Sequence, residues 1–403
     1  MNTTWMQAAS ESGFGLDHLP LGRVEAAGRT QAAVRIGDRV LPLAAAADRL
    51  SPVPAELLQS DTTSALLAAG PQVWADLRHS VQELLGTEAD AITLTTPIRD
   101  VKVLLPFDVA DYVDFYSSEH HAMNVGRLFR PDSPALPPNW KHLPIGYHGR
   151  SGTVVASGTP IGRPNGQTRP TGSADPAFGP SERLDVEVEV GFVVGVPSLL
   201  GEPVSAEAFS GHVYGVVLVN DWSARDLQAW EYQPLGPFLG KSFATSVGCW
   251  ITPLAALESA RTPGPKQEPL LPYLHDPDPW TLALDLELAV NGTVVSRPPF
   301  ASTYYSPGQQ LAHMTSNGAA LRTGDLYASG TVSGPERGQV GSLLELTAGG
   351  AEPVPLDGGR LLGFLEDGDE VRISGTAAAA NGGRVTLAEV TGRIEPAGRS
   401  VAN

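Results

Sequence analysis

Cysteine is nearly absent from this chain of 403 residues, since Cys249 is the only one. No disulfide can therefore form within the chain, and a zinc site built from several cysteine thiolates is excluded. Long apolar runs are also missing. No stretch reaches the roughly 18 consecutive apolar residues of a membrane-spanning helix, and the N-terminus lacks the apolar segment of a secretory signal. We expect no membrane partner and a cytoplasmic location.

Positive charge is scarce as well, because 27 Lys and Arg stand against 44 Asp and Glu, for a formal net charge of −17. This balance argues against nucleic acid as a partner, since phosphate binding needs a basic face. It leaves room for a divalent cation. An anionic substrate would require Arg and Lys to cluster locally.

Three familiar catalytic patterns are missing: H-E-x-x-H, G-x-S-x-G and G-x-G-x-x-G. The zincin, serine hydrolase and dinucleotide-binding interpretations therefore lose support. Residues 234–243 come close to a phosphate-binding P-loop, but Leu235 occupies the position of its first glycine. We therefore reject nucleotide binding and regard Lys241 as a cation held on a rigid Gly/Pro loop.

Glycine (44) and proline (35) are plentiful, which predicts many turns and short strands. The first hundred residues contain no cluster of catalytic residue types and predict a small α+β domain. From residue 101 onward the pattern predicts a strand-rich region that carries most of the aromatic residues and histidines. Helices are predicted at 45–50, 64–85 and 223–231. Strands are predicted on either side of Gly37-Asp38 and at 184–194, 213–220, 281–290, 369–373 and 384–390, with a turn at Asn291-Gly292. Residues 163–180 predict a polar loop that is suited to function or a partner contact.

The strongest chemical signal is Asp185-Val-Glu-Val-Glu189. Alternation along a strand predicts that Asp185, Glu187 and Glu189 share one face. That face is either solvated or, because the flanking residues are strongly apolar, buried. Buried carboxylates are costly unless a cation compensates them, and oxygen clusters suit Ca²⁺ or Mg²⁺.

Two other stretches carry candidate chemistry. Asp221 follows the apolar run 213–220, so it is either a ligand at a strand end or the cap of the next helix. Residues 114–130 gather Asp, Tyr, His and Arg side chains, and Tyr147 and His148 follow. This grouping favours catalysis without deciding it.

Taken together, these stretches resemble the fumarylacetoacetate hydrolase family. The resemblance is dense from about residue 106 to 365 and weaker before it. Motifs of this length and order are highly specific. The segments that carry it are Asp114-Phe-Tyr-Ser-Ser, His121-Ala-Met-Asn-Val-Gly, Leu143-Pro-Ile-Gly-Tyr-His-Gly-Arg150, Asp185-Val-Glu-Val-Glu189, Asn220-Asp-Trp-Ser-Ala-Arg-Asp226, the stretch 230–243 and Gly330-Thr-Val-Ser-Gly-Pro-Glu336.

The resemblance implies a mainly β fold with some α-helix. An SH3-like barrel would occupy residues 1–105, a catalytic mixed β-roll would occupy residues 106–403, and two chains would form a homodimer. The implied activity cleaves a carbon–carbon bond in a β-diketo acid, converting 4-fumarylacetoacetate and water to fumarate and acetoacetate, the last step of tyrosine and phenylalanine breakdown. The implied cofactor is Ca²⁺ and/or Mg²⁺, with no organic cofactor.

The resemblance also implies roles for individual residues. The implied metal ligands are Asp114, Glu187, Glu189 and Asp221, with Lys241 and Thr245 beside the metal or its waters. His121 would be the general base and Glu345 its orienting acid, while Arg225, Gln228 and Lys241 would stabilise developing charge. Substrate contacts would come from Tyr116, Arg130, Tyr147, Arg225, Gln228, Tyr232 and Thr331.

His120 departs from the family pattern, in which Gln is expected, and adds a second candidate base. Neighbours in an extended or irregular segment point opposite ways, so we predict that only His121 faces the site.

Two alternatives remain. A related keto-acid decarboxylase or hydratase would keep the carboxylates but lack the pair His121 and Glu345. A non-catalytic calcium-binding protein would leave the Arg, Gln and Tyr set unexplained.

Overall fold

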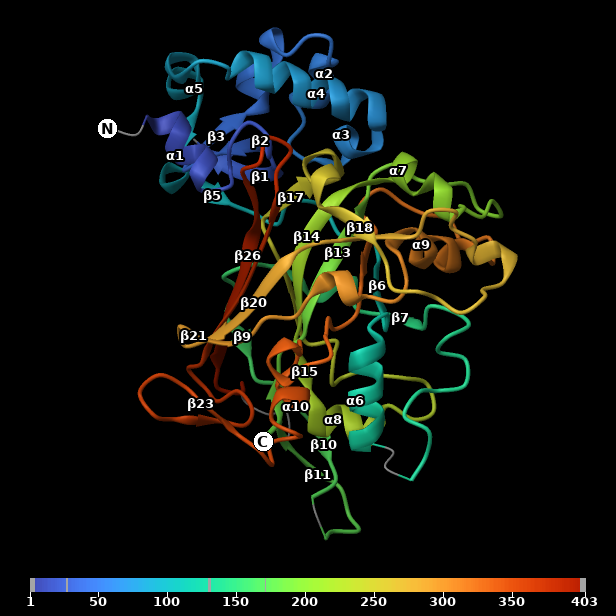
Figure 1. Ribbon diagram of the computed structural model, residues 1–403. Helices are drawn as coiled ribbons and strands as arrows, with labels where there is room; N and C mark the ends of the chain where they lie inside the picture. The colour runs from blue at the N-terminus through green and yellow to red at the C-terminus, as the bar shows by residue number, and fades with distance from the viewer. Residues whose placement is uncertain (1–3, 27, 130–131, 171, 399–403) are drawn as a thin grey trace.

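The computed structural model describes residues 4–26, 28–129, 132–170 and 172–398. Its fold is mixed α/β and rich in strands (Figure 1). The larger sheet has 13 strands. Its main order is β4 (Thr96–Pro97), β3 (Arg39–Pro42), β2 (Arg29–Ile36), β1 (Leu21–Ala26), β17 (Trp250–Pro253), β14 (Val213–Asp221), β13 (Val188–Val194), β22 (Leu326–Ala328), β6 (Tyr112–Phe115) and β7 (Gly146–His148), with β5 (Lys102–Val103) on β1, β16 (Thr245–Val247) on β14, and β8 (Val154–Ala156) on β16.

The N-terminal strands are continuous with the rest of this sheet, because Leu21 and Gly22 of β1 pair with Ile251 and Trp250 of β17. Among the described residues, no strand pairing closes β1–β5 into a ring. The SH3-like barrel and the boundary at residues 105/106 therefore stay predictions. The structure does contain the two predicted strands on either side of Gly37-Asp38.

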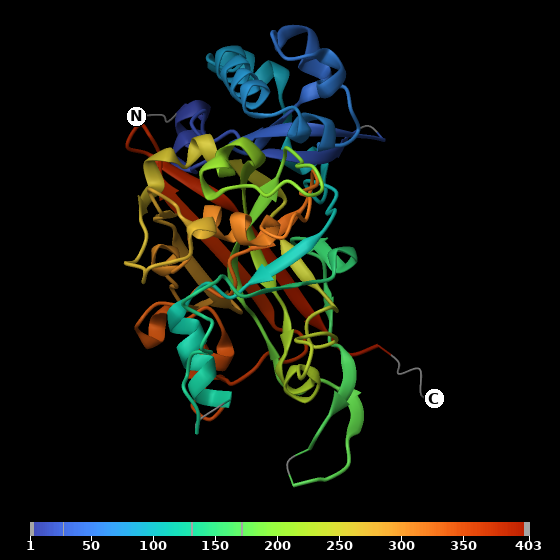
Figure 2. The ribbon, with the colours of Figure 1, turned by 90° about the vertical axis from the view of Figure 1, so that its right-hand side faces the viewer.

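A second sheet of five strands packs across the first. Its order is β21 (Thr293–Ser296), β20 (Asp285–Val290), β25 (Glu370–Ala378), β26 (Arg384–Glu395) and β9 (Ile161–Gly162). Its long red strands run diagonally through the middle of Figure 2. One large apolar core joins residues of both sheets, including Leu218 of β14, Ile373 of β25 and Val390 of β26. The predicted turn at Asn291-Gly292 is confirmed as the link between β20 and β21.

Helices cover the ends and edges of the sheets. Figure 1 shows α2–α5 at the top and α6 near the bottom. The α-helices are α1 (Trp5–Glu11), α2 (Ala55–Leu58), α3 (Ser64–Ala68), α4 (Pro71–Leu84), α5 (Glu88–Leu94), α6 (Glu119–Phe129), α7 (Phe209–His212), α8 (Arg225–Glu231), α9 (Pro307–Thr315) and α10 (Leu343–Leu346). Among the described residues, no helix has the length and apolarity needed to cross a bilayer.

Several local predictions were wrong in detail. The strand predicted at 281–290 is two strands, β19 (Trp280–Leu282) and β20, and the helix predicted at 223–231 begins only at Arg225. The helix predicted at 64–85 is two helices, because Gly70 adopts φ +89° and Pro71 starts a new helix. The predicted helix at 45–50 lies in a 3₁₀ segment, Leu43–Arg49. The predicted strand 184–194 is interrupted at residues 186–187 between β12 (Leu184–Asp185) and β13.

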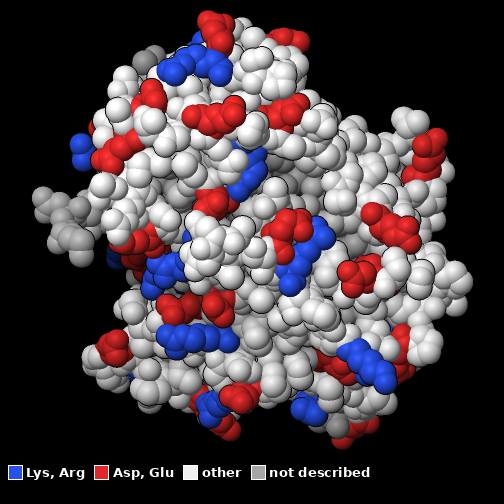
Figure 3. Space-filling view, turned by 45° about the horizontal axis from the view of Figure 1, so that its top comes forward, with Lys and Arg blue, Asp and Glu red and all other residues white. Residues whose placement is uncertain are grey.

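The polar stretch 163–180 is not a plain loop. It forms a hairpin of β10 (Asn165–Thr168) and β11 (Ala177–Pro180) that projects from the lower end of the molecule (Figures 1 and 2). Phe178 on this hairpin is 59% exposed. On the face in Figure 3, basic side chains are scattered among acidic ones, unlike the continuous basic face of a nucleic-acid-binding protein.

Candidate metal centre and active site

Four carboxylates on or next to three strands of the large sheet meet at one point. Asp114 lies on β6, Glu187 and Glu189 lie just before and within β13, and Asp221 ends β14. One oxygen from each lies within 4.8 Å of the others, and all four side chains are buried. The adjacency of β13 and β14, with Val188 opposite Asn220, brings the acidic residues together. The structure thus brings the four predicted ligands together, and their binding of one divalent cation stays a prediction.

The geometry of this carboxylate cluster fits a hard divalent cation. Oxygens on opposite sides of a Ca²⁺ ion, each about 2.3–2.6 Å from it, are separated by about 4.6–5.2 Å. Both carboxylate oxygens of Glu189 and Oδ1 of Asp114 are buried and have no hydrogen-bond partner among the residues that the structure describes. Buried anionic oxygens without partners are strongly unfavourable. The four carboxylates could therefore hold a metal ion.

The electrostatics of the cluster agree with this interpretation. Burial raises the pKa of Glu189 well above its usual value, and the charge of Asp114 adds to the effect. Burial and Asp221 likewise raise the pKa of Asp114. Without a positive charge at the centre, the protein disfavours ionisation of both groups.

The positive charges of Lys241 and Arg225 compensate the negative charges of the other two carboxylates, Glu187 and Asp221. The ammonium of Lys241 donates to Glu187 and, at 2.6 Å, to Oδ2 of Asp221. Nη1 of Arg225 lies 2.8 Å from Oε1 of Glu187. Burial acts to raise the pKa of Glu187, but the charges of Lys241 and Arg225 outweigh it and lower that pKa to about 2.

Asp221 is held by hydroxyl groups as well as by Lys241. Thr245 donates to its Oδ1 at 2.9 Å, and the Tyr147 hydroxyl donates to Oδ2 at 3.2 Å. The helix α8 starts after Ala224, which makes no side-chain cap. The alternative role of Asp221 as a helix cap is therefore wrong, because Ala224 occupies the cap position and Asp221 is bound within the site.

Asp185 does not share the environment of Glu187 and Glu189, so the predicted common face of three carboxylates is wrong. The strand is interrupted after Asp185. Its Oδ1 accepts from the backbone N–H of Leu343 at 2.7 Å, and its Oδ2 accepts from Nε of Arg225 at 2.8 Å. Asp185 therefore holds Arg225 in place beside Glu187.

His121 and Glu345 form a buried hydrogen-bonded pair. Nδ1 of His121 lies 2.7 Å from Oε2 of Glu345, and a carboxylate in this position fixes the proton on Nδ1 and leaves Nε2 as the acceptor. Burial acts to raise the pKa of Glu345, but His121 and the hydrogen bonds from His121, Asn124 and Ser342 outweigh it and lower that pKa. The lowered pKa favours the ionised carboxylate of Glu345, which accepts the hydrogen bond from Nδ1–H of His121.

The segment of His120 and His121 is helical, not extended or irregular. Both lie in the first turn of α6, where successive side chains are rotated by about 100°. The helix nevertheless separates them, because His121 is buried and lines the central cavity while His120 is half-buried and does not line it. The prediction that only His121 faces the site holds in this geometry, although its stated reason was wrong.

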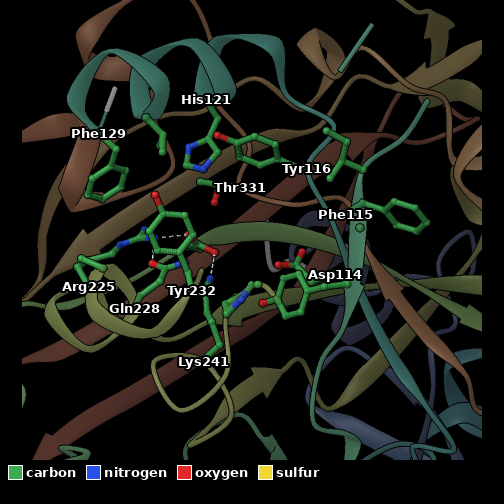
Figure 4. A pocket seen from close by; sticks show the side chains of 18 of the residues that line it. Asp114, Phe115, Tyr116, His121, Phe129, Arg225, Gln228, Tyr232, Lys241 and Thr331 are labelled. Carbon is green, nitrogen blue, oxygen red and sulfur yellow. Dashed lines mark hydrogen bonds and ion pairs between the residues drawn. The ribbon is translucent and has the colours of Figure 1, made fainter. Parts of the chain in front are cut away.

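A cavity of about 380 Å³ joins the carboxylate cluster to the His121–Glu345 pair. Figure 4 shows His121, Tyr116 and Thr331 on one side of it and Gln228, Tyr232 and Lys241 on another. Predicted site residues that line it are Asp114, Tyr116, His121, Tyr147, Glu187, Arg225, Gln228, Tyr232, Lys241 and Thr331. Glu189, Asp221, Thr245 and Glu345 are not among its lining residues, and Asp221 and Thr245 line a neighbouring cavity. Arg130 lies outside the described residues.

One glycine allows the walls of this cavity to approach each other. Gly330 has φ +77°, and a Cβ at this position would lie 2.0 Å from the carbonyl oxygen of Phe115. Only glycine is compatible with both conditions. It brings Thr331 next to Tyr116, the two residues that follow Gly330 and Phe115.

Several residues of the site were missed from the sequence. Asn124, Ser333 and Ser342 all donate to the carboxylate of Glu345. Asn124 stands three residues after His121, so a correct helix prediction would have placed both on one face. Tyr112, whose buried hydroxyl has no partner, stands two residues before Asp114 on β6 and was available from strand alternation.

Comparison with known proteins gives a consistent result over the whole chain. Residues 17–106 match the family described as fumarylacetoacetase N-terminal, and residues 111–386 match fumarylacetoacetate (FAA) hydrolase C-terminal. The chain is 42% identical to the fumarylacetoacetase of Caenorhabditis elegans and 40% identical to that of Homo sapiens. Each alignment covers 98% of this chain and 99% of the relative.

Solved structures share the fold at lower identity. A structure described as a putative HpcE protein from Mycobacterium smegmatis superimposes with a TM-score of 0.55 at 20% identity, over 93% of this chain and 99% of that one. The matches of both halves and the identity to full-length relatives lead to one conclusion: the chain belongs to the fumarylacetoacetate hydrolase family.

Proposed function

We propose that this protein is a fumarylacetoacetase, which hydrolyses 4-fumarylacetoacetate to fumarate and acetoacetate. One observation carries the proposal: a buried four-carboxylate cluster with unpartnered oxygens shares a cavity with a hydrogen-bonded His–Glu pair. The relatives named above, which match almost end to end, carry this activity in their names.

We infer that Asp114, Glu187, Glu189 and Asp221 hold Ca²⁺ or Mg²⁺, because carboxylate oxygens are the ligands that these hard cations prefer. When bound, the cation supplies Lewis-acid polarisation to the oxygens of a β-diketone. Lys241 and Thr245 orient the ligand carboxylates through their bonds to Asp221.

In this proposal His121 acts as the general base. With Nδ1–H directed at Glu345, its Nε2 accepts a proton from water, and the hydroxide attacks the carbonyl carbon of the fumaryl group. The carbon–carbon bond then breaks, and its electron pair moves onto the acetoacetate fragment as an enolate. The proton held by His121 returns to that carbon, so atoms and charge balance.

Arg225, Gln228 and Lys241 stabilise the negative charge that develops on the leaving enolate. Tyr116, Tyr147, Tyr232 and Thr331 line the cavity and position the substrate. Arg130, as the family pattern implies, completes the recognition of a carboxylate. These local cations explain how a protein with a net charge of −17 binds a dianion.

A turnover assay with fumarylacetoacetate, before and after chelation, tests the function. We expect activity to disappear with chelator and to return on addition of Mg²⁺ or Ca²⁺. Glu189→Gln treated in the same way should not recover. Turnover that is insensitive to chelation would contradict the metal role. A metal-loaded protein without turnover would point to another reaction of the family.

We also propose a homodimer that works in the cytoplasm. Leu235, Phe238 and Leu239 are 96%, 64% and 47% exposed on one loop at the mouth of the cavity. An apolar group of this kind is unfavourable in water and is typical of an interface. Sedimentation should give a dimer, and Leu235→Ser/Phe238→Ser should shift it to a monomer. Cell fractionation tests the location.

A further inference from the structure

A second cavity, of about 230 Å³, lies where the N-terminal helices meet the large sheet. It is bounded by α4 on one side and by the start of β14 on the other. Its lining shares no residue with the cavity of the proposed active site. The walls are mostly apolar, with Trp74, Leu77 and Val81 from α4 facing Val213 and Leu254. Trp74 also packs edge-on against Tyr214, which lines the same space.

One cation faces this apolar cavity without a carboxylate partner. Among the described residues, Arg78 of α4 makes no ion pair. It donates instead to the backbone carbonyls of His18, at 2.7 Å, and Asp17. A guanidinium carries five N–H donors, so donors remain available. Burial lowers the pKa of Arg78, although Tyr214 and Asp17 act against this. The positive charge is therefore incompletely compensated.

The other charged groups at the cavity are already paired. Glu258 and Arg261 form an ion pair at 3.0 Å, and Arg261 also stacks on Trp280 with 4.4 Å to the ring centroid. Glu258 therefore pairs with Arg261 and not with Arg78. The cavity thus combines apolar walls, one cation that forms no ion pair among the described residues, and the hydroxyl-bearing ring of Tyr214.

We propose that this cavity binds a small arylalkanoic acid, with the carboxylate on Arg78 and the ring between α4 and the start of β14. An apolar cavity of about 150 Å³ accommodates a benzene molecule, so a volume of about 230 Å³ leaves room for a short carboxylate-bearing chain. A guanidinium is the side chain best suited to a planar carboxylate. The bound acid would also join α4 to β14 and stabilise their contact.

Calorimetric titration of the full-length protein with 3-phenylpropionate tests this proposal, with 3-phenylpropan-1-ol as the neutral probe of the same shape. Ala75 of α4 lines the cavity from its exposed edge, so Ala75→Phe should fill the space and abolish binding. His79→Phe adds an aromatic ring on the same helix outside the cavity lining and should bind as the parent does. Arg78→Met should weaken binding about tenfold or more, since it removes a charge-assisted contact.

The alcohol should bind at least about tenfold more weakly than the acid. The proposal is overturned if the parent protein shows no binding up to about 10 mM, if Ala75→Phe binds as tightly as the parent, or if the alcohol matches the acid. Should Arg78→Met fail to fold because it loses the carbonyls of Asp17 and His18, the comparison of Ala75→Phe with His79→Phe still decides the matter.

Discussion

Asp185 and Glu189 lie four residues apart, are both fully buried, and have opposite environments. Asp185 receives two backbone N–H groups from the start of α10 and the guanidinium of Arg225. Both oxygens of Glu189 lack any partner among the described residues. Equal burial therefore does not mean equal function. Asp185 is satisfied by the protein itself and Glu189 is not, which agrees with the metal-ligand role proposed for Glu189.

The largest effect is expected from Glu189→Gln, which removes a charge that the folded chain does not compensate. Metal-dependent turnover should be abolished and metal affinity strongly reduced. The metal-free protein should be as stable as the parent or more stable, because the change removes a buried carboxyl group whose ionisation the folded chain disfavours. Calorimetry with Mg²⁺ and Ca²⁺ and urea unfolding of the metal-free proteins measure the two properties. If Glu189→Gln kept its metal affinity, Glu189 would not be a metal ligand, and the proposed functional difference between Glu189 and Asp185 would be wrong.

The next largest effect is expected at the His121–Glu345 pair. The buried carboxylate of Glu345 accepts a hydrogen bond from His121, the proposed base, and orients its ring. His121→Ala should reduce turnover by about 10²–10⁴-fold, the usual contribution of a positioned base, while metal binding persists. Glu345→Gln should lose a large part of the same factor. His120→Ala is the matched control and should stay within a few-fold of the parent. A dead His120→Ala beside an active His121→Ala would reverse the assignment of the base.

A third test changes Asp185, whose carboxylate oxygens accept hydrogen bonds from within the protein. Asp185→Asn leaves Arg225 without its full counter-charge in a buried position, which typically costs about 3–5 kcal/mol. The free energy of unfolding of the metal-free protein should therefore fall, in contrast to Glu189→Gln. Urea unfolding of both variants under one set of conditions gives the answer. Equal stability of the two would show that the hydrogen bonds of Asp185 add nothing.

The smallest effect concerns His18, a buried group satisfied in its neutral form. Its Nδ1–H donates to the carbonyl of Gly13 and its Nε2 accepts from the hydroxyl of Thr252, each at 2.9 Å. Burial lowers its pKa from 6.5 to about 3. The unfolded chain then binds the proton first, so stability is complete above the unfolded pKa and is lost as pH falls from 6.5 toward 3.

His18→Gln should flatten this dependence by up to about 1.4 kcal/mol per pH unit within that window. Urea midpoints of parent and variant at several pH values measure the difference. Identical slopes below pH 6.5 would mean that the buried imidazole is protonated without penalty.

By itself the sequence indicated the candidate site residues and the longer strands of the core. Alternation and continuous apolar runs located β13, β14 and β20, since side-chain period is a local property of the chain. Motif order identified the four carboxylates and the His121–Glu345 pair. Only the tertiary structure decided which acids remain unsatisfied. Asp185, Glu187 and Glu189 look equivalent in sequence, and the interruption after Asp185 together with distant partners at residues 343–344 separates them. Hydrogen-bond partners more than 150 residues away leave no local pattern, because they are set by how the strands and α10 pack.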